Sequence, residues 1–241
     1  ETPADSNADN IYEVQVQADD GFGNQVSQDI SVTVTDVNEA PEFSSSTTPS
    51  VAENGTAVLT LSATDPEGDT ITYSLIGGVD QGLFSLVGAN LSFAAAPDYE
   101  IPGDNDTDNV YEVQVQADDN NGHQVPQTIN VTVTDVNEAP VFSSSATPSI
   151  AENTTAVVTL TVDDPESDTI SYSLNSGWAD GALFNLSGAD LSFVSGRDFE
   201  NPVDVGTDNM YVVEVTADDG NGNQVTQTVT VTITDVNEAP V

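Results

Sequence analysis

The stretch Asp36-Val37-Asn38-Glu39-Ala40-Pro41 decides how this chain is organised, because it occurs three times. The other copies are residues 135–140 and 235–240, so successive copies lie 99 and 100 residues apart. Each copy follows a run of alternating apolar and polar residues, such as 30–35, which predicts a β-strand. Proline lacks the N–H that a sheet ladder needs, so each strand must end there. A spacing of this length is typical of whole domains, and each copy is therefore predicted to be a linker between domains.

The chain is strongly acidic. Its 241 residues include 41 Asp or Glu and one basic residue, Arg197, which gives a formal net charge of −40. Nucleic acids and anionic membranes are bound through Lys and Arg, so the composition predicts no nucleic-acid partner and no direct membrane contact. Two interpretations of the charge remain at this point: a solvated surface adapted to high salt, or a set of cation-binding sites.

Other composition features narrow the chemistry. Cysteine is absent and there is one histidine, His123, so disulfides are excluded and little is left for zinc or copper. No run of about 18 apolar residues occurs, so no membrane insertion is predicted within this segment.

Short alternating segments between the acidic clusters predict the fold. In the middle repeat they are residues 57–63, 70–75, 83–86, 90–93, 110–117 and 124–134, with further extended segments near Phe43 and Val51. About seven strands in about 100 residues, without helical spacing of apolar residues, predict an all-β chain of tandem seven-stranded Greek-key β-sandwiches. Alternation places Tyr111, Val113 and Val115 on the core face.

The repeat spacing predicts the domain boundaries. Residues 41–139 are predicted to be one complete repeat, and 140–241 a second one with the start of the next linker. Residues 1–40 correspond only to the last two strands and the linker of a repeat, because Glu1-Thr2-Pro3 aligns with 100–102. The chain is therefore expected to be a window on a longer array, with the first repeat completed by upstream residues or by strands from another copy.

Acidic motifs recur at matching positions in each repeat. They are Ala-Glu-Asn at 52–54 and 151–153, Asp-Pro-Glu at 65–67 and 164–166, Asp-aromatic-Glu at 98–100 and 198–200, and Ala-Asp-Asp at 117–119 and 217–219. Together with the linker motif, and in this order, they resemble tandem cadherin-like repeats of the bacterial or archaeal type over essentially the whole chain. The resemblance implies cadherin- or immunoglobulin-like sandwiches joined by calcium-binding linkers.

The resemblance also implies the ligands of about two to three Ca²⁺ ions per junction. For the first junction they are Glu1, Asp36, Asn38, Glu39, Asp65, Glu67, Asp69 and Asp119. For the second they are Glu53, Asp98, Glu100, Asp135, the carbonyl of Val136, Asn137, Glu138, Asp164, Glu166, Asp168 and Asp219. The last linker carries a half-site of Glu152, Asp198, Glu200, Asp235, Asn237 and Glu238. Calcium takes six to eight oxygen ligands and tolerates mixed carboxylate, amide and carbonyl donors, so the residue types suit it.

Other acidic groups match no ligand position, and we expect them on the solvated surface. They are Asp19, Asp104, Asp106, Asp108, Asp118, Asp204, Asp208 and Asp218. No enzyme is predicted: His123 lies in a turn with no nucleophile pattern beside it, and carboxylates that recur in every repeat do not mark a single active site.

The sequence thus predicts a calcium-rigidified extracellular segment of a large adhesin, stalk or filament that mediates cell-surface adhesion or structural extension. Its partners would be calcium and either other copies of the chain or a cell-surface protein or carbohydrate. The alternative is an accessory carbohydrate-binding or spacer module of a secreted polysaccharide-active enzyme. Only 6% of the residues are aromatic, which gives a sugar-stacking surface little material.

Overall fold

The alternating segments form β-strands throughout the part of the chain that the computed structural model describes, residues 4, 5 and 7–238. The only helices there are two three-residue 3-10 turns, η1 (Gln81–Leu83) and η2 (Gly181–Leu183), so the all-β prediction is confirmed. None of the described helices is long and apolar enough to cross a membrane. The chain divides into two units, Glu1–Asp135 and Val136–Val241, and each is described by itself.

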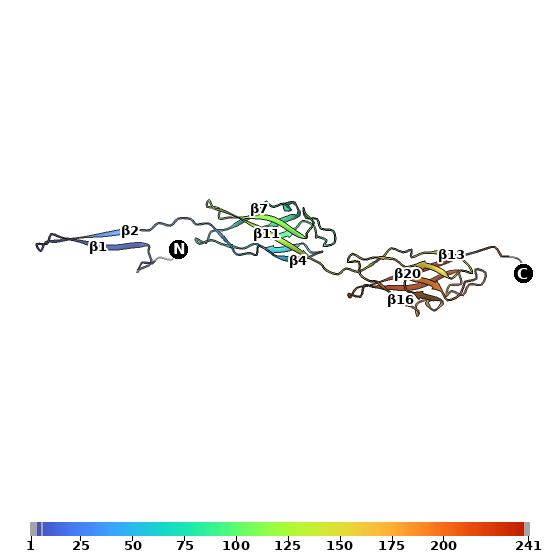
Figure 1. Cartoon of the computed structure of the whole chain (residues 1–241). Helices are drawn as coiled ribbons and strands as arrows, with labels where there is room; N and C mark the ends of the chain where they lie inside the picture. Colours follow the sequence, from blue (N-terminus) through green and yellow to red (C-terminus); the bar gives the residue numbers. More distant parts are fainter. Residues whose placement is uncertain (1–3, 6, 239–241) are drawn as a thin grey trace. The chain divides into compact units, whose positions relative to one another are not determined.

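The first unit begins with a β-hairpin made of β1 (Ile11–Asp19) and β2 (Gln25–Thr33) (Figure 1). The two strands pair antiparallel along their whole length and form a two-stranded sheet of their own. Their apolar side chains are exposed: Val14 is 52% and Val16 44% accessible.

A β-sandwich follows the hairpin in the first unit. Its strands are β3 (Glu42–Phe43), β4 (Ser50–Ala52), β5 (Ala57–Thr60), β6 (Ala63–Thr64), β7 (Thr72–Gly77), β8 (Phe84–Val87), β9 (Asn90–Phe93), β10 (Val110–Asp118) and β11 (Gln124–Thr134). One sheet has the order β4-β11-β10-β7, the other β5-β9-β8, and β3 pairs with β6. The chain leaves the first sheet after β7, forms β8 and β9 in the second, and returns to place β10 beside β7, as a Greek key requires.

These nine segments correspond to the seven predicted strands because the first two strands are each split. The predicted strand 57–63 breaks between β5 and β6, where Leu61 is buried and its N–H bonds to the carbonyl of Ala89 at 2.7 Å. On either side of this break the chain pairs with different neighbours, β9 and β3. The first predicted strand is split in the same way, into β3 and β4. Its first part, β3, pairs with β6, and its second part, β4, pairs parallel to β11, so the two parts belong to different sheets.

The core face of β10 is the predicted one. Tyr111, Val113 and Val115 are at most 2% exposed. The ring of Tyr111 meets that of Phe93 edge-on at 5.1 Å, and Phe93 stacks on Phe84 at 4.7 Å. Burying one Val side chain contributes about 1.5–3 kcal/mol, so these strands supply much of the stability of the sandwich.

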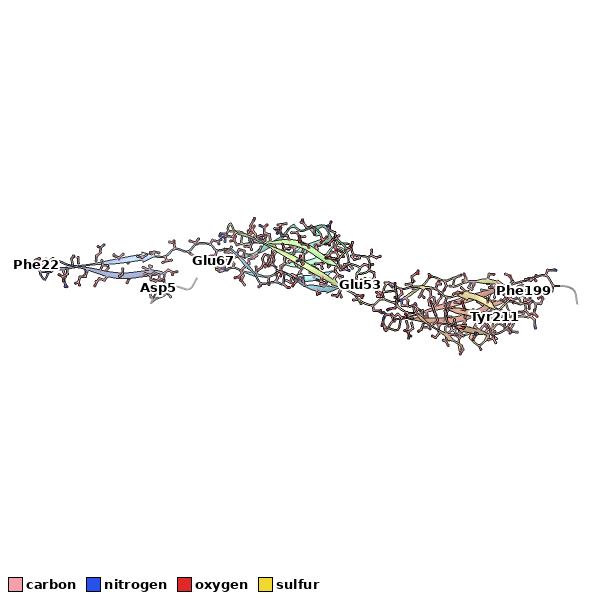
Figure 2. The ribbon with its side chains drawn as sticks, viewed as in Figure 1. Asp5, Phe22, Glu53, Glu67, Phe199 and Tyr211 are labelled. Carbon is pink, nitrogen blue, oxygen red and sulfur yellow. The ribbon has the colours of Figure 1, made fainter. Side chains whose placement is uncertain are left out.

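The second unit repeats this architecture. Its strands are β12 (Val141–Phe142), β13 (Ser149–Ala151), β14 (Ala156–Thr159), β15 (Val162–Asp163), β16 (Ser171–Asn175), β17 (Phe184–Ser187), β18 (Asp190–Phe193), β19 (Met210–Asp218) and β20 (Gln224–Thr234). The sheet orders β13-β20-β19-β16 and β14-β18-β17 match those of the first unit, and β12 pairs with β15. Tyr211, labelled in Figure 2, takes the place of Tyr111. It is fully buried, and its ring meets that of Phe193 at 5.1 Å.

Candidate metal-binding site

The linker and a turn of the first sandwich bring their carboxylates together. Asp36 and Glu39 come from the linker, and Glu67 from the turn between β6 and β7; each offers an oxygen within 4.8 Å of the others. The Glu39 N–H donates to Glu67 Oε2 at 3.0 Å. A side-chain hydrogen bond with Glu39, followed by this backbone N–H, lowers the pKa of Glu67. Glu67 therefore stays ionised and is positioned by the linker itself.

The Asp-Pro-Glu turn presents carboxylate oxygens that no hydrogen bond uses. Asp65 Oδ1 accepts from the N–H groups of Glu67 at 3.0 Å and Asp69 at 3.2 Å. Within the described residues, Asp65 Oδ2 and Glu67 Oε1 are buried and have no hydrogen-bond partner, and the same holds for Asp164 Oδ2 and Glu166 Oε1 in the second unit. Buried polar atoms are usually satisfied, so the recurrence in both units indicates oxygens available to a cation.

The Ala-Asp-Asp motif holds a buried carboxylate against the linker. Asp119 is 1% exposed, and its Oδ1 accepts the backbone N–H groups of residues 121, 122 and 123 at 2.8–2.9 Å. Its Oδ2 accepts from Asn38 Nδ2 at 2.7 Å, across 81 residues of sequence. Burial raises the pKa of Asp119, but the bonds from Asn38 and the backbone outweigh it and hold this pKa well below its usual range. In the second unit Asp219 binds Asn137 at 2.8 Å in the same way, and its pKa is lowered against burial by the same kind of bonds.

A second carboxylate cluster lies at the opposite end of the first sandwich, where Figure 2 labels Glu53. Glu53 is 4% exposed, and one oxygen each of Glu53, Asp98 and Glu100 lies within 4.8 Å of the others. The Tyr99 N–H donates to Glu53 Oε2 at 2.7 Å, which fixes this buried carboxylate on the Asp-Tyr-Glu motif.

The equivalent cluster of the second unit contains Glu152, Glu200 and Asp235. Backbone N–H groups of Phe199 at 2.9 Å and Val236 at 2.8 Å bind Glu152 and lower its pKa. Burial, then the charges of Glu152 and Glu200, raise the pKa of Glu238. Like charges are thus crowded at this strand end.

These buried acids face no lysine or arginine. In the described part of the chain, the one close contact between an acidic group and a basic side chain joins Asp119 Oδ2 and His123 Nδ1 at 3.2 Å, and it is an ion pair only when the imidazole is protonated. Arg197 instead donates from Nε to the Ser195 carbonyl at 2.8 Å and lies 5.2 Å over the ring of Phe193. Carboxylates close together without a basic partner repel one another, and a bound cation would offset that repulsion.

The remaining predicted ligands lie around these clusters. Asp69 and Asp168 accept side-chain amide bonds from Asn121 at 2.5 Å and Asn221 at 2.6 Å. Residues on the strand ends and linkers are exposed: Asp98, Asp135, Val136, Asp198, Asp235 and Asn237. Glu138 is half-buried and its N–H donates to Glu166 Oε2 at 3.3 Å. Glu1 lies outside the described residues.

The structure corrects one expectation and adds a contact that the sequence did not predict. Asp104 and Asp204 are 5% and 3% exposed, so they are not part of a solvated surface. They are buried because backbone N–H groups of their own loops bind them, at 2.9 Å from Asp108 and 3.0 Å from Asp208. The repeated Asp-x-x-x-Asp-Asn pattern of the loops could have indicated this. His123 is not a free turn residue either, since its Nδ1 lies 2.7 Å from Asn38 Nδ2 of the linker.

Comparison with known proteins identifies the family. Residues 38–132 and 137–232 each match the family described as "Bacterial Ig domain", and the chain belongs to this family as two tandem copies. Similar curated proteins are cadherins. This chain is 30% identical to human Protocadherin Fat 1, over 98% of this chain and 5% of that protein. It is 27% identical to mouse Cadherin-17, over 88% of this chain and 28% of that protein. The chain thus spans less than a third of the length of either relative.

Solved structures show the same architecture. The extracellular domain of protocadherin GammaB4 is 25% identical, with a TM-score of 0.55 over 96% of this chain and 38% of that one. The protocadherin gammaB7 EC3-6 cis-dimer structure is 20% identical, with a TM-score of 0.57 over 95% of this chain and 61% of that one. The prediction of tandem cadherin-like sandwiches is confirmed.

Proposed function

We propose that this chain is a calcium-rigidified repeat segment of an extracellular adhesion protein, with repeats at 1–40 (incomplete), 41–139 and 140–241. One observation carries the proposal: the linker residues Asp36, Asn38 and Glu39 converge with Glu67 and Asp119 of the following sandwich. We call these residues, together with Asp65, the linker site.

Calcium is the cation that this donor set fits. The linker site offers carboxylate and amide oxygens only, and hard oxygen donors in a mixed set suit Ca²⁺. The oxygens without partners on Asp65 and Glu67 are the ones we assign to the ion. We propose the same role for the matching residues of the second unit, Asn137, Glu138, Asp164, Glu166, Asp168 and Asp219, and for the strand-end clusters around Glu53 and Glu152.

Calcium would stiffen the chain at the linkers. Without the ion, the linker holds several carboxylates that repel one another, and only a few hydrogen bonds to the sandwich would resist its bending. When the ion is bound, residues of the linker and of the sandwich turn share it, so bending requires loss of coordination. Extracellular calcium modules bind in the range of about 10⁻⁴–10⁻³ M, which suits a location outside the cell.

The relatives support adhesion rather than catalysis. The similar proteins are cadherins and protocadherins, and the carboxylate clusters recur in both units, unlike a single active site. We infer that the whole protein extends from a cell surface and binds either other copies of itself or a surface protein or carbohydrate. The array would supply reach and stiffness.

A matched pair of variants tests the calcium proposal. Asp20 stands in the β1–β2 turn as Asp119 stands in the β10–β11 turn, and its Oδ1 likewise accepts backbone N–H groups, from Phe22 at 2.8 Å and Asn24 at 3.1 Å. Its Oδ2, however, accepts from Asn24 Nδ2 of the same turn at 2.6 Å, whereas Asp119 binds the linker. We expect Asp119→Ala to lose calcium at the linker site and Asp20→Ala to bind as the wild type does.

Calorimetric titration and melting of the full chain provide the measurements. Calcium at 100 times its dissociation constant should stabilise the sandwiches by about 2.7 kcal/mol, and chelation should remove this gain. In Asp119→Ala the gain should shrink, while in Asp20→Ala it should persist. Absence of binding at millimolar calcium would reject the proposal and leave a salt-adapted acidic surface.

A further inference from the structure

We propose that the loop Asp104–Asn109 is a separate calcium site, with Asp104, Asp106 and Asp108 as its carboxylate ligands. The loop precedes β10 and contains none of the linker or strand-end motifs. Each of the three aspartates offers an oxygen within 4.8 Å of the other two. This geometry brings three negative charges to one point of the middle repeat.

The buried aspartate of this loop has an oxygen that the protein leaves without a donor. Asp104 is 5% exposed, and its Oδ2 accepts the Asp108 N–H at 2.9 Å. Its Oδ1 is buried and has no hydrogen-bond partner within the described residues. In the equivalent loop of the second unit, Asp204 Oδ1 accepts the Asn209 N–H at 3.2 Å, so both of its oxygens are used. An acidic oxygen that is buried, unpaired and close to two other carboxylates has the properties of a cation ligand.

The charges around the loop favour a cation. Asp80 lies behind the loop and is also buried, with its oxygens accepting the N–H groups of Asn105 and Glu112, both at 2.8 Å. Among the described residues no basic side chain pairs with an acid of this loop, so a divalent ion would relieve the repulsion directly.

Sequence spacing and backbone conformation agree with a calcium loop. The carboxylates occupy alternate positions of Asp104-Asn105-Asp106-Thr107-Asp108-Asn109, as in the first five positions of an EF-hand loop. Asn109, at the sixth position, has φ 63°, the conformation for which the EF-hand loop uses glycine. The residue eleven positions after Asp104 is Val115, so the bidentate glutamate that completes an EF-hand is missing. We therefore expect an affinity at the weak end of protein calcium sites, about 10⁻⁴–10⁻³ M.

The second unit provides a natural control. Its loop 204–209 has the same backbone, with φ 52° at Thr207 and 66° at Asn209, but Gly206 replaces Asp106. A Cβ at Gly206 would lie 3.0 Å from Asp208 Oδ1 and 3.3 Å from Asp204 Oδ2. A side chain at this position therefore points between the flanking carboxylates. The second unit keeps the loop but lacks its central ligand.

Two reciprocal substitutions in the full chain test the site. Equilibrium dialysis against about 5 mM radioactive calcium, above the expected dissociation constant, counts the ions bound per chain. Asp106→Gly copies the loop of the second unit, and we expect it to bind one ion fewer than the wild type. Backbone amide NMR signals of residues 104–110 should shift with calcium in the wild type and stay fixed in the variant. The linker site contains none of these residues, so its calcium should remain.

The opposite change guards against a loss caused by misfolding. Gly206→Asp should add one ion per chain, with calcium-dependent shifts at 204–210. An Asp106→Gly protein that keeps its β-sheet circular dichroism and binds as many ions as the wild type overturns the proposal, whether or not the linker site binds calcium. If Asp106→Gly loses its fold, Asp106→Ala, which removes the carboxylate without adding the freedom of glycine, decides in its place, and an ion count equal to that of the wild type overturns the proposal.

Discussion

Two hairpins of this molecule have almost the same sequence and opposite surroundings. Residues 13–20 and 112–119 both read Glu-Val-Gln-Val-Gln-Ala-Asp-Asp, and both hairpins have the same register, with Tyr12 opposite Val32 and Tyr111 opposite Val131. Tyr12 is 38% exposed, whereas Tyr111 is 2% exposed. Strand pairing is therefore encoded locally, by alternation and turn residues, but burial depends on other strands.

The difference lies in what each hairpin is joined to. β10 and β11 are flanked by β7 and β4 in one sheet, and their apolar face packs on residues of the other sheet such as Phe84 and Phe93. β1 and β2 form a two-stranded sheet, and Phe22 at its tip is 93% exposed (Figure 2). A two-stranded hairpin alone is marginally stable in water.

Amide hydrogen exchange should show the largest contrast between the hairpins. We expect amides of β10 and β11 to exchange only through unfolding of the sandwich, and amides of β1 and β2 through local opening. With a sandwich stability of at least about 5 kcal/mol, the rates should differ on the order of 1000-fold or more. Equally slow exchange in β1 would show that its apolar face is covered in solution, and sedimentation would then show whether another copy covers it.

Matched truncations of the two tyrosines should give a smaller but still clear difference. Tyr111→Ala removes a buried ring that meets Phe93 and accepts the Gly103 N–H at 3.0 Å, so we expect it to destabilise the first sandwich by about 3–5 kcal/mol. Tyr12→Ala should change the stability by no more than about 0.5 kcal/mol, because its ring is partly solvated. Urea denaturation measures both. A similar loss from both variants would contradict the exposure of the β1–β2 face.

The acidic loops before the strands should give the smallest effect, which depends on pH. Burial raises the pKa of Asp204, but the N–H groups of Asp208 and Asn209 outweigh it and lower this pKa in the folded protein. A lowered folded-state pKa contributes stability above the unfolded-state pKa, which is lost as the pH falls through the folded-state pKa. In chelator, Asp204→Asn should therefore lower the melting temperature of the second unit most near pH 7, and the deficit should shrink below about pH 4.

Asp5 is the matched control for this measurement. Its oxygens accept the N–H groups of Asp9 at 3.0 Å and Asn10 at 3.1 Å, as Asp204 does in its loop, but its loop leads into the exposed β1. Asp5→Asn should leave the melting of both sandwiches unchanged at every pH. A deficit of Asp204→Asn that does not change with pH would mean that ionisation of this carboxyl is not what stabilises the loop.

Part of the fold and of the site could be predicted from the sequence. Alternation identified β10 and its core face, and the repeated acidic motifs identified Asp36, Glu39 and Glu67, which the structure brings together. The break at Leu61 was missed, because a run of alternating residues does not show where a strand changes partner. The burial of Asp104 was missed too, because it depends on backbone N–H groups that reach this carboxylate only in the folded conformation of the loop.

By itself, the sequence determined the elements whose causes are local. Alternation sets which side of a strand is apolar, and the spacing of the linkers sets the repeat. The tertiary structure decided which of two nearly identical hairpins is buried and which carboxylates meet. The physical reason is that burial and charge crowding are sums over neighbours distant in the chain: Tyr111 is buried by strands that Tyr12 does not have, and Asn38 meets Asp119 across 81 residues.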